Sequence, residues 1–211
     1  MIKVLFAASE CVPFVKTGGL ADVVGALPPV LKARGVDVRV VLPLYGEIPQ
    51  EFKSQMKHVV DFEVELGWRR QYCGIETLEY EGLTWYFVDN RYYFDRPYIY
   101  GMGGDEYERY GFFCRAVLNA LPLIGFQPDI LHCHDWQAAM TPAYLRALYH
   151  DWCPQTKLVF TIHNVEYQGW ADASFFDNIL GLPDEYRASL TFDGAINMMT
   201  VSYTHLRAHE T

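Results

Sequence analysis

The chain has 211 residues, 51% of them hydrophobic, which is enough for one sizeable domain with a core on both sides of a sheet. Its formal net charge is −9 with no run of Lys or Arg, so we expect no nucleic-acid partner. Five scattered cysteines without a C-x-x-C pair argue against a disulfide framework, and no apolar run approaches the roughly 20 residues of a membrane span.

The first part of the chain predicts a strand, a glycine turn, a helix and a second strand. Val4 to Ala8 is an apolar run typical of a buried parallel strand, and it is too short for a signal peptide, so we expect a cytoplasmic protein. A helical pattern runs from Leu20 to Arg34, with a kink or restart at Pro28-Pro29 and Gly35 as the C-cap. Another buried strand follows at Val36 to Leu42. This order is typical of a doubly wound, Rossmann-like α/β fold.

Residues 57 to 89 change character and predict a small antiparallel insertion. Three segments there alternate apolar and polar side chains: Val59 to Leu66, Gln71 to Tyr80 and Leu83 to Val88. After a Tyr-rich loop, we expect Asp105 to cap a helix that runs to about Gly125. The remaining predicted elements are a strand, a helix and a strand, at Ile130 to Cys133, Trp136 to Tyr149 and Leu158 to Ile162.

Polar residues gather where three predicted strands end. Ser9-Glu10 follows the first strand, His132 to Trp136 ends another, and Thr161 to Asn164 ends a third. Because parallel strands end at one edge of a sheet, these clusters are expected to face a single crevice.

The segment Lys16 to Gly19 lies between the first strand and its helix. Glycines let the backbone approach a ligand, and a lysine beside helix-start amides favours phosphate. A simple turn without a ligand explains the same residues, because the pattern is neither G-x-G-x-x-G nor a Walker loop.

The histidines near the strand ends allow several interpretations. His132 and His134 share one side of their strand while Cys133 faces away, but no third metal ligand is apparent, so we expect no metal. The alternative has one histidine packed beneath the sheet edge and Asp135 capping the next helix. His163 either offers hydrogen bonds to a hydroxylated ligand or is structural.

Carboxylates add one further possibility. A hydrolytic pair drawn from Glu10, Asp22 and Asp135 is compatible with the sequence, although nothing in their spacing specifies it.

Five segments together resemble the bacterial glycogen synthase and plant starch synthase family. The longest is KTGGLADVVGALP at Lys16 to Pro28, which is specific for this family. The others follow in the family's order: YFDRP at Tyr93 to Pro97, HCHDW at His132 to Trp136, TIHNVEYQG at Thr161 to Gly169 and FDGAINMM at Phe192 to Met199. The resemblance covers residues 1 to about 199.

The resemblance implies a GT-B fold, in which two Rossmann-like domains face each other across a cleft. This chain would be the N-terminal, acceptor-side domain, and the C-terminal domain that holds most of the nucleotide would be absent. The implied reaction transfers glucose from ADP-glucose to the non-reducing end of an α-1,4-glucan with retention, without a metal or other cofactor. The chain alone is therefore expected to be inactive.

The resemblance also implies roles for individual residues. Lys16, Gly18 and Gly19 match the loop near the donor phosphates, and Asp22 and Asp135 match acidic residues of the sugar cleft. His163 matches the histidine near the transferring glucose. Further contacts to the glucan are implied for Trp136, Asn164, Tyr93 and Asp95.

The sequence departs from the family after Met199. Residues 200 to 211 do not follow the family's pattern, and we expect a foreign or aberrant segment there. Three alternative functions remain: a glucan-binding module without catalysis, a sugar-phosphate hydrolase with a complete site in this domain, and a sucrose- or trehalose-type synthase.

Overall fold

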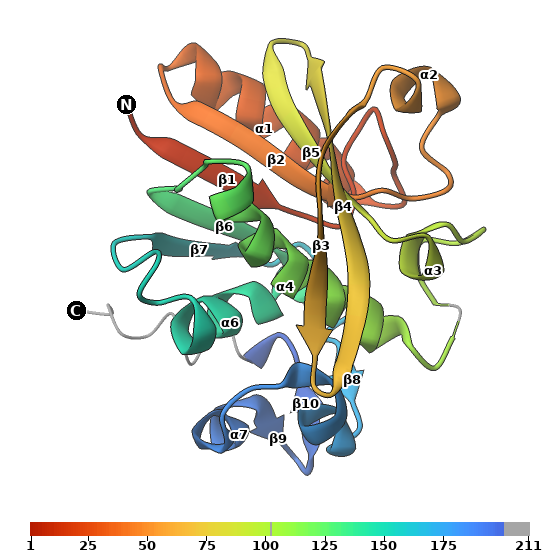
Figure 1. The fold of residues 1–211 in the computed structure, drawn as a ribbon, viewed down its shortest axis with the longest axis vertical. Helices are drawn as coiled ribbons and strands as arrows, with labels where there is room; N and C mark the ends of the chain where they lie inside the picture. Colours follow the sequence, from red (N-terminus) through yellow and green to blue (C-terminus); the bar gives the residue numbers. More distant parts are fainter. Residues whose placement is uncertain (102, 201–211) are drawn as a thin grey trace.

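The computed structural model describes residues 1–101 and 103–200. Its centre is a seven-stranded sheet in the order β3-β4-β5-β2-β1-β6-β7 (Figure 1). Strands β5, β2, β1, β6 and β7 run parallel to one another, whereas β4 is antiparallel to both β3 and β5. The strands are β1 (Lys3–Ala7), β2 (Asp37–Pro43), β3 (Lys57–Leu66), β4 (Arg69–Tyr80), β5 (Leu83–Asp89), β6 (Ile130–His134) and β7 (Lys157–Thr161).

The central strand β1 shows why the apolar runs form the sheet's interior. Its residues Val4 to Ala7 are all buried, as expected for a parallel strand covered on both faces. Ala7 lies opposite Val41 in β2 and Cys133 in β6, so β1 has a partner on each side. The chain crosses from one side of β1 to the other between β2 and β6, which makes the end of β1 a topological switch point.

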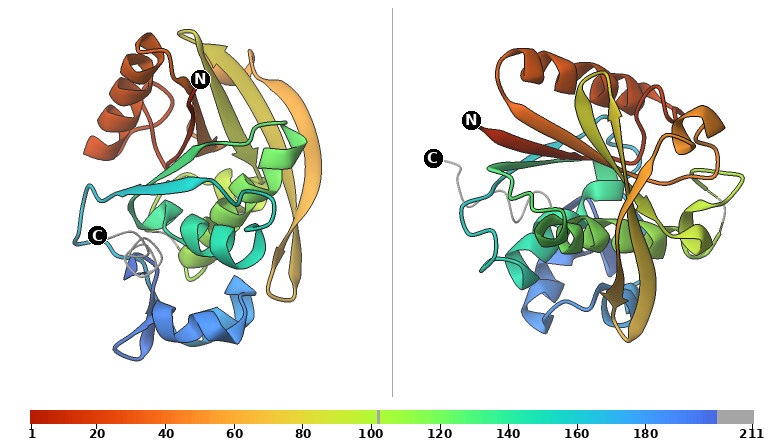
Figure 2. Two further views of the ribbon diagram at one scale, coloured as in Figure 1. Left: turned by 90° about the vertical axis from the view of Figure 1, so that its left-hand side faces the viewer. Right: turned by 45° about the horizontal axis from the view of Figure 1, so that its top comes forward.

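Helices cover both faces of this sheet (Figure 2). Helix α1 (Gly19–Ala33) packs on one face, and α4 (Glu106–Leu123) and α6 (Met140–Leu148) pack together on the other. The predicted doubly wound architecture is therefore present.

The end of α1 follows the prediction at Gly35. This glycine has φ +84°, and its N–H donates to the Lys32 carbonyl at 2.9 Å while Val36 N–H reaches the Leu31 carbonyl at 3.2 Å. These two bonds form a Schellman motif, which needs the left-handed conformation that glycine adopts without strain. Of the kink or restart predicted at Pro28-Pro29, the restart is wrong, because α1 continues through both prolines.

Two other helix predictions need correction. Asp105 precedes α4 but does not cap it with its side chain; instead both carboxylate oxygens bind Arg96. The helix expected from Trp136 to Tyr149 is divided into α5 (Asp135–Ala138) and α6, which are separated by Ala139.

The antiparallel insertion is part of the main sheet. Strands β3 and β4 form a hairpin, whereas β5 pairs antiparallel with β4 and parallel with β2. The hairpin therefore extends the parallel sheet through β5, as Figure 1 shows.

The remaining elements are short. A three-stranded sheet in the order β8-β10-β9, which the sequence patterns did not predict, lies in the last described part of the chain. These elements are α2 (Gln50–Lys53), α3 (Arg91–Phe94), β8 (Trp170–Ala171), the π-helix η1 (Phe176–Leu180), the 3-10 helix η2 (Asp184–Tyr186), α7 (Arg187–Leu190), β9 (Thr191–Phe192) and β10 (Ala195–Asn197).

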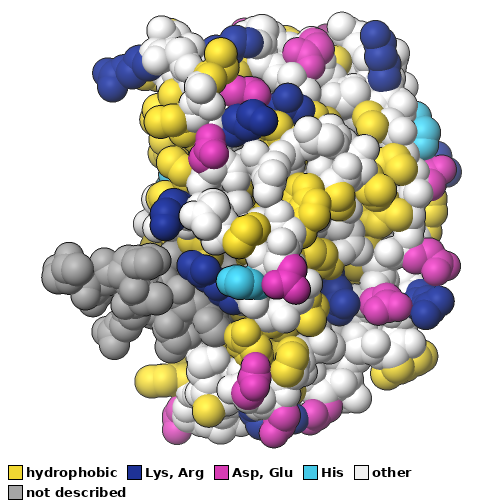
Figure 3. All heavy atoms as spheres, turned by 60° about the vertical axis from the view of Figure 1, so that its left-hand side comes forward, with side chains coloured by type: hydrophobic (Ala, Val, Ile, Leu, Met, Phe, Trp, Pro, Cys, Tyr) yellow, Lys and Arg dark blue, Asp and Glu magenta, His cyan; other side chains and the backbone are white. Residues whose placement is uncertain are grey.

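On the face shown in Figure 3, basic and acidic side chains are interspersed with hydrophobic ones. No helix within the described ranges is long and apolar enough to cross a membrane. Of the segment predicted to be foreign, residues 201–211 lie outside the described residues.

Candidate active site

A cavity of about 740 Å³ opens at the carboxyl ends of β1, β6 and β7. All three polar clusters predicted from the strand ends contribute to its wall, through Glu10, Asp135 with Trp136, and His163 with Asn164. These strands are neighbours in the sheet, so their ends meet at the switch point beside β1. The volume lies within the range of small-molecule sites, roughly 300–1,000 Å³.

The loop before α1 is tied to the end of β1 by the buried carboxylate of Glu10. Its Oε2 accepts hydrogen bonds from the Thr17 backbone N–H, from the Thr17 hydroxyl at 2.9 Å and from the Gly18 N–H at 3.2 Å. Gly18 and Gly19 line the cavity. The loop is thus positioned by a carboxylate that was predicted to face the crevice but was not predicted to hold this loop.

Lys16 and Asp22 form an ion pair beside this loop. The Lys16 Nζ atom lies 2.7 Å from Asp22 Oδ1 and 2.8 Å from Oδ2. Both side chains are about half exposed, and neither lines the cavity. The structure therefore places these two predicted site residues together, adjacent to the cavity.

Asp135 connects the ends of β6 and β7. It has φ +54°, and its Oδ1 accepts hydrogen bonds from the His163 N–H at 2.6 Å and the Asn164 N–H at 3.4 Å. The interpretation of Asp135 as a helix cap is therefore wrong. Burial raises the pKa of its carboxyl group, an effect that the hydrogen bonds from the His163 and Asn164 amides oppose.

Three histidines lie together at the cavity, with His163 in its wall. The rings of His132 and His134 lie 4.1 Å apart, on the same side of β6 as predicted, and His134 Nδ1 lies 2.9 Å from His163 Nε2. Burial lowers the pKa of His132 to about 4 and that of His134 well below its ordinary value, with further lowering from the neighbouring rings. Both imidazoles are therefore neutral at pH 7.

Trp136 forms an aromatic part of the wall. Its ring packs edge-on against Tyr107 at 5.5 Å and Tyr110 at 5.0 Å between centroids. Gly169, with φ +70°, lies so close to the indole that a Cβ there would be 2.7 Å from Trp136 Cε3. The side chain is 7% exposed, so it presents a limited surface to the cavity.

The loop after β7 supplies wall residues that the sequence analysis did not name. Asn164 Oδ1 accepts a hydrogen bond from the Glu166 N–H at 2.9 Å, which shapes the turn. Tyr167 and Trp170 then line the cavity with side chains that are 62% and 40% exposed. The sequence offered a signal for them, because both aromatic residues lie in the loop that follows a polar strand end.

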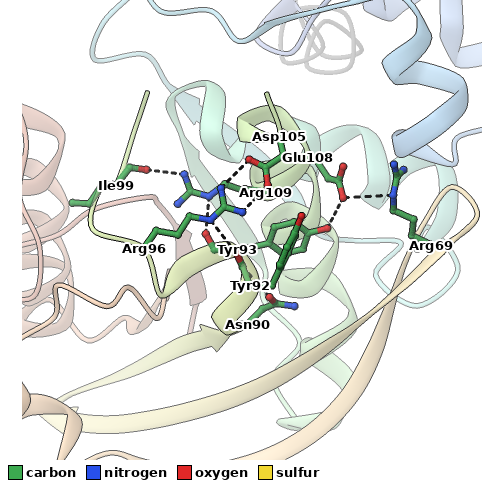
Figure 4. A network of polar contacts seen from close by, with 9 residues as sticks. All are labelled: Arg69, Asn90, Tyr92, Tyr93, Arg96, Ile99, Asp105, Glu108 and Arg109. Atoms are coloured by element: carbon green, nitrogen blue, oxygen red, sulfur yellow. Dashed lines mark hydrogen bonds and ion pairs between the residues drawn. The ribbon is translucent and has the colours of Figure 1, made fainter. Parts of the chain in front are cut away.

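Tyr93 and Asp95 do not line the cavity. Tyr93 is fully buried, and its hydroxyl donates to Glu108 Oε1 at 2.6 Å, next to Arg69 (Figure 4). Asp95 is exposed at the end of α3. The YFDRP segment therefore reaches the cavity at neither of these two positions in this structure.

Arg109, which belongs to the same network, holds the Tyr-rich loop beside the cavity. The buried Arg109 donates from Nε to the Tyr93 carbonyl at 2.7 Å and from Nη1 to the Ile99 carbonyl at 3.2 Å (Figure 4). The next residue, Tyr100, lines the cavity, and its hydroxyl lies 2.7 Å from Ser9 Oγ. Arg109 thus fixes the loop from within the core.

Across residues 1–101 and 103–200, no group of three or more His, Cys, Asp or Glu side chains is placed to hold a metal ion. His132 Nε2 is instead hydrogen-bonded to Thr161 Oγ1 at 2.8 Å.

The fold and the cavity define a Rossmann-like α/β domain with a candidate site at the carboxyl edge of its sheet. Residues 3–209 match the model of the starch synthase catalytic domain, and the chain belongs to this family.

Individual relatives agree with this assignment. The chain is 54% identical over 202 residues to a glycogen synthase from Anoxybacillus flavithermus and 52% identical over 202 residues to one from Desulforamulus reducens. In both cases the match covers 94% of this chain and 42% of the relative. The chain thus spans less than half the length of these curated relatives.

A solved structure supports the fold. The catalytic domain of starch synthase IV from Arabidopsis thaliana, bound to ADP and acarbose, matches with a TM-score of 0.84 and 29% identity. The match covers 96% of this chain and 43% of that one. The predicted family and fold class, one Rossmann-like half of a GT-B enzyme, are confirmed.

Proposed function

We propose that this chain is the acceptor-side half of a retaining glucosyltransferase that moves glucose from ADP-glucose to the non-reducing end of an α-1,4-glucan such as glycogen. The observation that carries the proposal is the cavity, in which residues of the HCHDW and TIHNVEYQG segments form one wall. The solved relative bound to ADP and acarbose supports these two classes of ligand.

The glucan would lie along the aromatic side of the cavity. Tyr167 and Trp170 expose apolar ring faces, and Asn164 and Gln168 provide polar groups beside them. Sugars combine apolar faces with hydroxyl groups, so this mixture of rings and amides suits them. Trp136 would contribute the small part of its ring that faces the cavity.

The donor phosphates would approach the loop at Gly18 and Gly19. Lys16 is the nearby cation, and it is now paired with Asp22. We propose that Asp22 holds Lys16 beside the loop, so that a phosphate could exchange with the carboxylate as its partner. A pair this exposed contributes only about 0–1 kcal/mol, so such an exchange would cost little.

His163 and Asp135 would act near the transferring glucose. An imidazole lone pair and fixed dipoles can stabilise the positive charge that develops at the sugar. The departing phosphate would guide the attacking hydroxyl, without a metal or another cofactor. The remaining groups around the donor would come from the second, nucleotide-binding domain, a proposal supported by the 42% share of the relatives' length that the chain matches.

We also propose a cytoplasmic location. All five cysteines are free thiols and are buried, which is in keeping with a reducing compartment.

The test is calorimetric titration of the purified chain with maltoheptaose and, separately, with ADP-glucose. We expect glucan binding with little or no nucleotide binding, since the donor would need both domains. Tyr167→Ala should weaken maltoheptaose binding about tenfold, because it removes an exposed ring from the cavity wall. Trp68→Ala is the matched control, since Trp68 is 76% exposed and lies outside the cavity.

Two outcomes would contradict the proposal. Tight ADP-glucose binding without glucan binding would mean that the ligands are assigned to the wrong domains. Steady transfer of glucose by this chain would show that no second domain is required.

A further inference from the structure

The rings of Phe6, His132 and His163 pack around the ring of His134. Phe6 and His132 lie on it, with ring centroids 5.2 Å and 4.1 Å away, and His163 lies nearly parallel to it at 15°. His134 is fully buried. In this orientation of the ring, Nδ1 lies 2.9 Å from His163 Nε2.

Two neutral arrangements can make this hydrogen bond. In the first, His134 carries its proton on Nδ1 and donates to His163 Nε2. In the second, His163 donates from Nε2, and His134 must then carry its own proton on its Nε2.

The surroundings of His134 Nε2 distinguish the two arrangements. This atom is buried and has no hydrogen-bond partner among the described residues. The second arrangement would bury an N–H donor without an acceptor, and such orphaned donors are rare in folded proteins. The first arrangement leaves only an unprotonated nitrogen there.

We propose that His134 is a positioning residue that donates its Nδ1 proton to His163 and so fixes His163 as the tautomer protonated on Nδ1. This inference rests on the proposed function only in giving His163 a role at the ligand. With Nε2 engaged by His134, Nδ1 is the ring nitrogen that remains for a ligand in the cavity, and it is a donor. His163 would then offer a hydrogen bond to an oxygen of the ligand, such as a sugar hydroxyl.

The stack also opposes a change in this arrangement. Burial and the neighbouring rings keep the pKa of His134 well below its ordinary value, so a charged His134 is disfavoured.

Nitrogen NMR of the 15N-labelled chain tests the proposal without any ligand. Protonated and unprotonated imidazole nitrogens have distinct chemical shifts, and the His163 signals are identified by their loss in His163→Asn. We expect a protonated Nδ1 and an unprotonated Nε2 for His163 at pH 7. A proton on Nε2 of His163 would overturn the proposal.

Substitutions at His134 separate the hydrogen bond from the packing. His134→Asn keeps an N–H donor near the position of Nδ1 and should leave the His163 tautomer unchanged. His134→Leu removes the donor and should give a mixture of tautomers. If His134→Leu does not fold, the wild-type and His134→Asn spectra still decide the question.

His132→Asn is the matched control, because His132 stacks on His134 but bonds Thr161. It should leave the His163 tautomer unchanged, and a shift equal to that in His134→Leu would overturn the proposal.

Maltoheptaose affinity should fall about fivefold to tenfold in His134→Leu and recover in His134→Asn. If the chain binds no glucan, the proposed function fails, while the spectra still report on His134.

Discussion

The carboxylate of Glu10 accepts a hydrogen bond from the backbone N–H of Gly18 at 3.2 Å. The same oxygen binds the N–H and hydroxyl of Thr17, so two amides of the glycine loop already have an anionic partner within the chain. This arrangement orders the loop at the end of β1, where the proposed donor site lies. In the proposed donor site, a phosphate would therefore meet the start of α1 at Gly19 rather than the Thr17 and Gly18 amides.

Glu10→Gln should therefore lower the free energy of unfolding. An amide oxygen accepts these hydrogen bonds less strongly than a carboxylate, and we expect a loss of about 1 to 2 kcal/mol. Urea denaturation followed by circular dichroism at pH 7 measures it.

The matched control is Glu166→Gln, which removes the same charge from an exposed position on the same cavity wall. We expect a change within about 0.5 kcal/mol there. Equal effects of the two substitutions would show that the Glu10 hydrogen bonds contribute nothing beyond the charge.

Gly169→Ala should destabilise the chain and disturb Trp136. The substitution forces alanine into φ +70° and places its Cβ 2.7 Å from Trp136 Cε3 and 3.1 Å from Met198 Cβ. We expect a loss of about 2 to 4 kcal/mol, together with a shift in tryptophan fluorescence.

Gly194→Ala isolates the backbone part of this effect. Gly194 has φ +78°, but a Cβ there would meet nothing within 4 Å. Its expected cost is about 1 to 2 kcal/mol, with unchanged fluorescence. If Gly169→Ala lowers the unfolding free energy no more than Gly194→Ala does, the chain relieves the contact between the added Cβ at position 169 and Trp136 without strain.

Local patterns predicted much of this site. The two-residue period of a strand put His132 and His134 on one side, and the glycine at position 35 marked the end of α1. Parallel topology predicted that the three polar strand ends would meet. Each of these features depends on neighbouring residues or on the order of strands in one sheet.

The contacts that the sequence could not supply come from distant residues. Asp135 binds backbone amides 28 and 29 positions later, and this contact takes its carboxylate away from α5. The buried Tyr93 donates its hydroxyl to Glu108 in α4, and Arg69 in β4 pairs with the same Glu108 carboxylate. Neither contact leaves a periodic signal in the sequence. The local pattern therefore suggested a cap at Asp135, and the glucan contact of Tyr93, which the family resemblance implies, stays a prediction.

Tyr93→Phe tests whether Tyr93 is structural. Removing the hydroxyl leaves the Glu108 carboxylate without its 2.6 Å donor, and we expect a loss of about 1 kcal/mol in unfolding free energy. Maltoheptaose affinity should stay within twofold of the wild type in the calorimeter. A tenfold loss of maltoheptaose affinity with unchanged stability would instead indicate that Tyr93 contacts the ligand.

The histidine stack should make the chain less stable in mild acid. In the folded chain the pKa of His132 is lowered from 6.5 to about 4, and that of His134 is well below 6.5, mainly through burial. The unfolded chain therefore binds more protons as pH falls from 6.5 to 4, so the unfolding free energy falls over that window. Each histidine contributes a slope of about 1.4 kcal/mol per pH unit.

Urea denaturation at intervals between pH 7 and pH 4.5 measures this slope. His132→Asn should reduce it by about half, because one of the two titrating histidines of the stack is removed.

His58 has the opposite effect on the slope, since its hydrogen bond to Glu76 raises its pKa. It lies at the surface, where solvent weakens this effect. His58→Asn should therefore leave the slope nearly unchanged or make it slightly steeper. A slope that is the same in the wild type and His132→Asn would show that the acid sensitivity arises outside the stack.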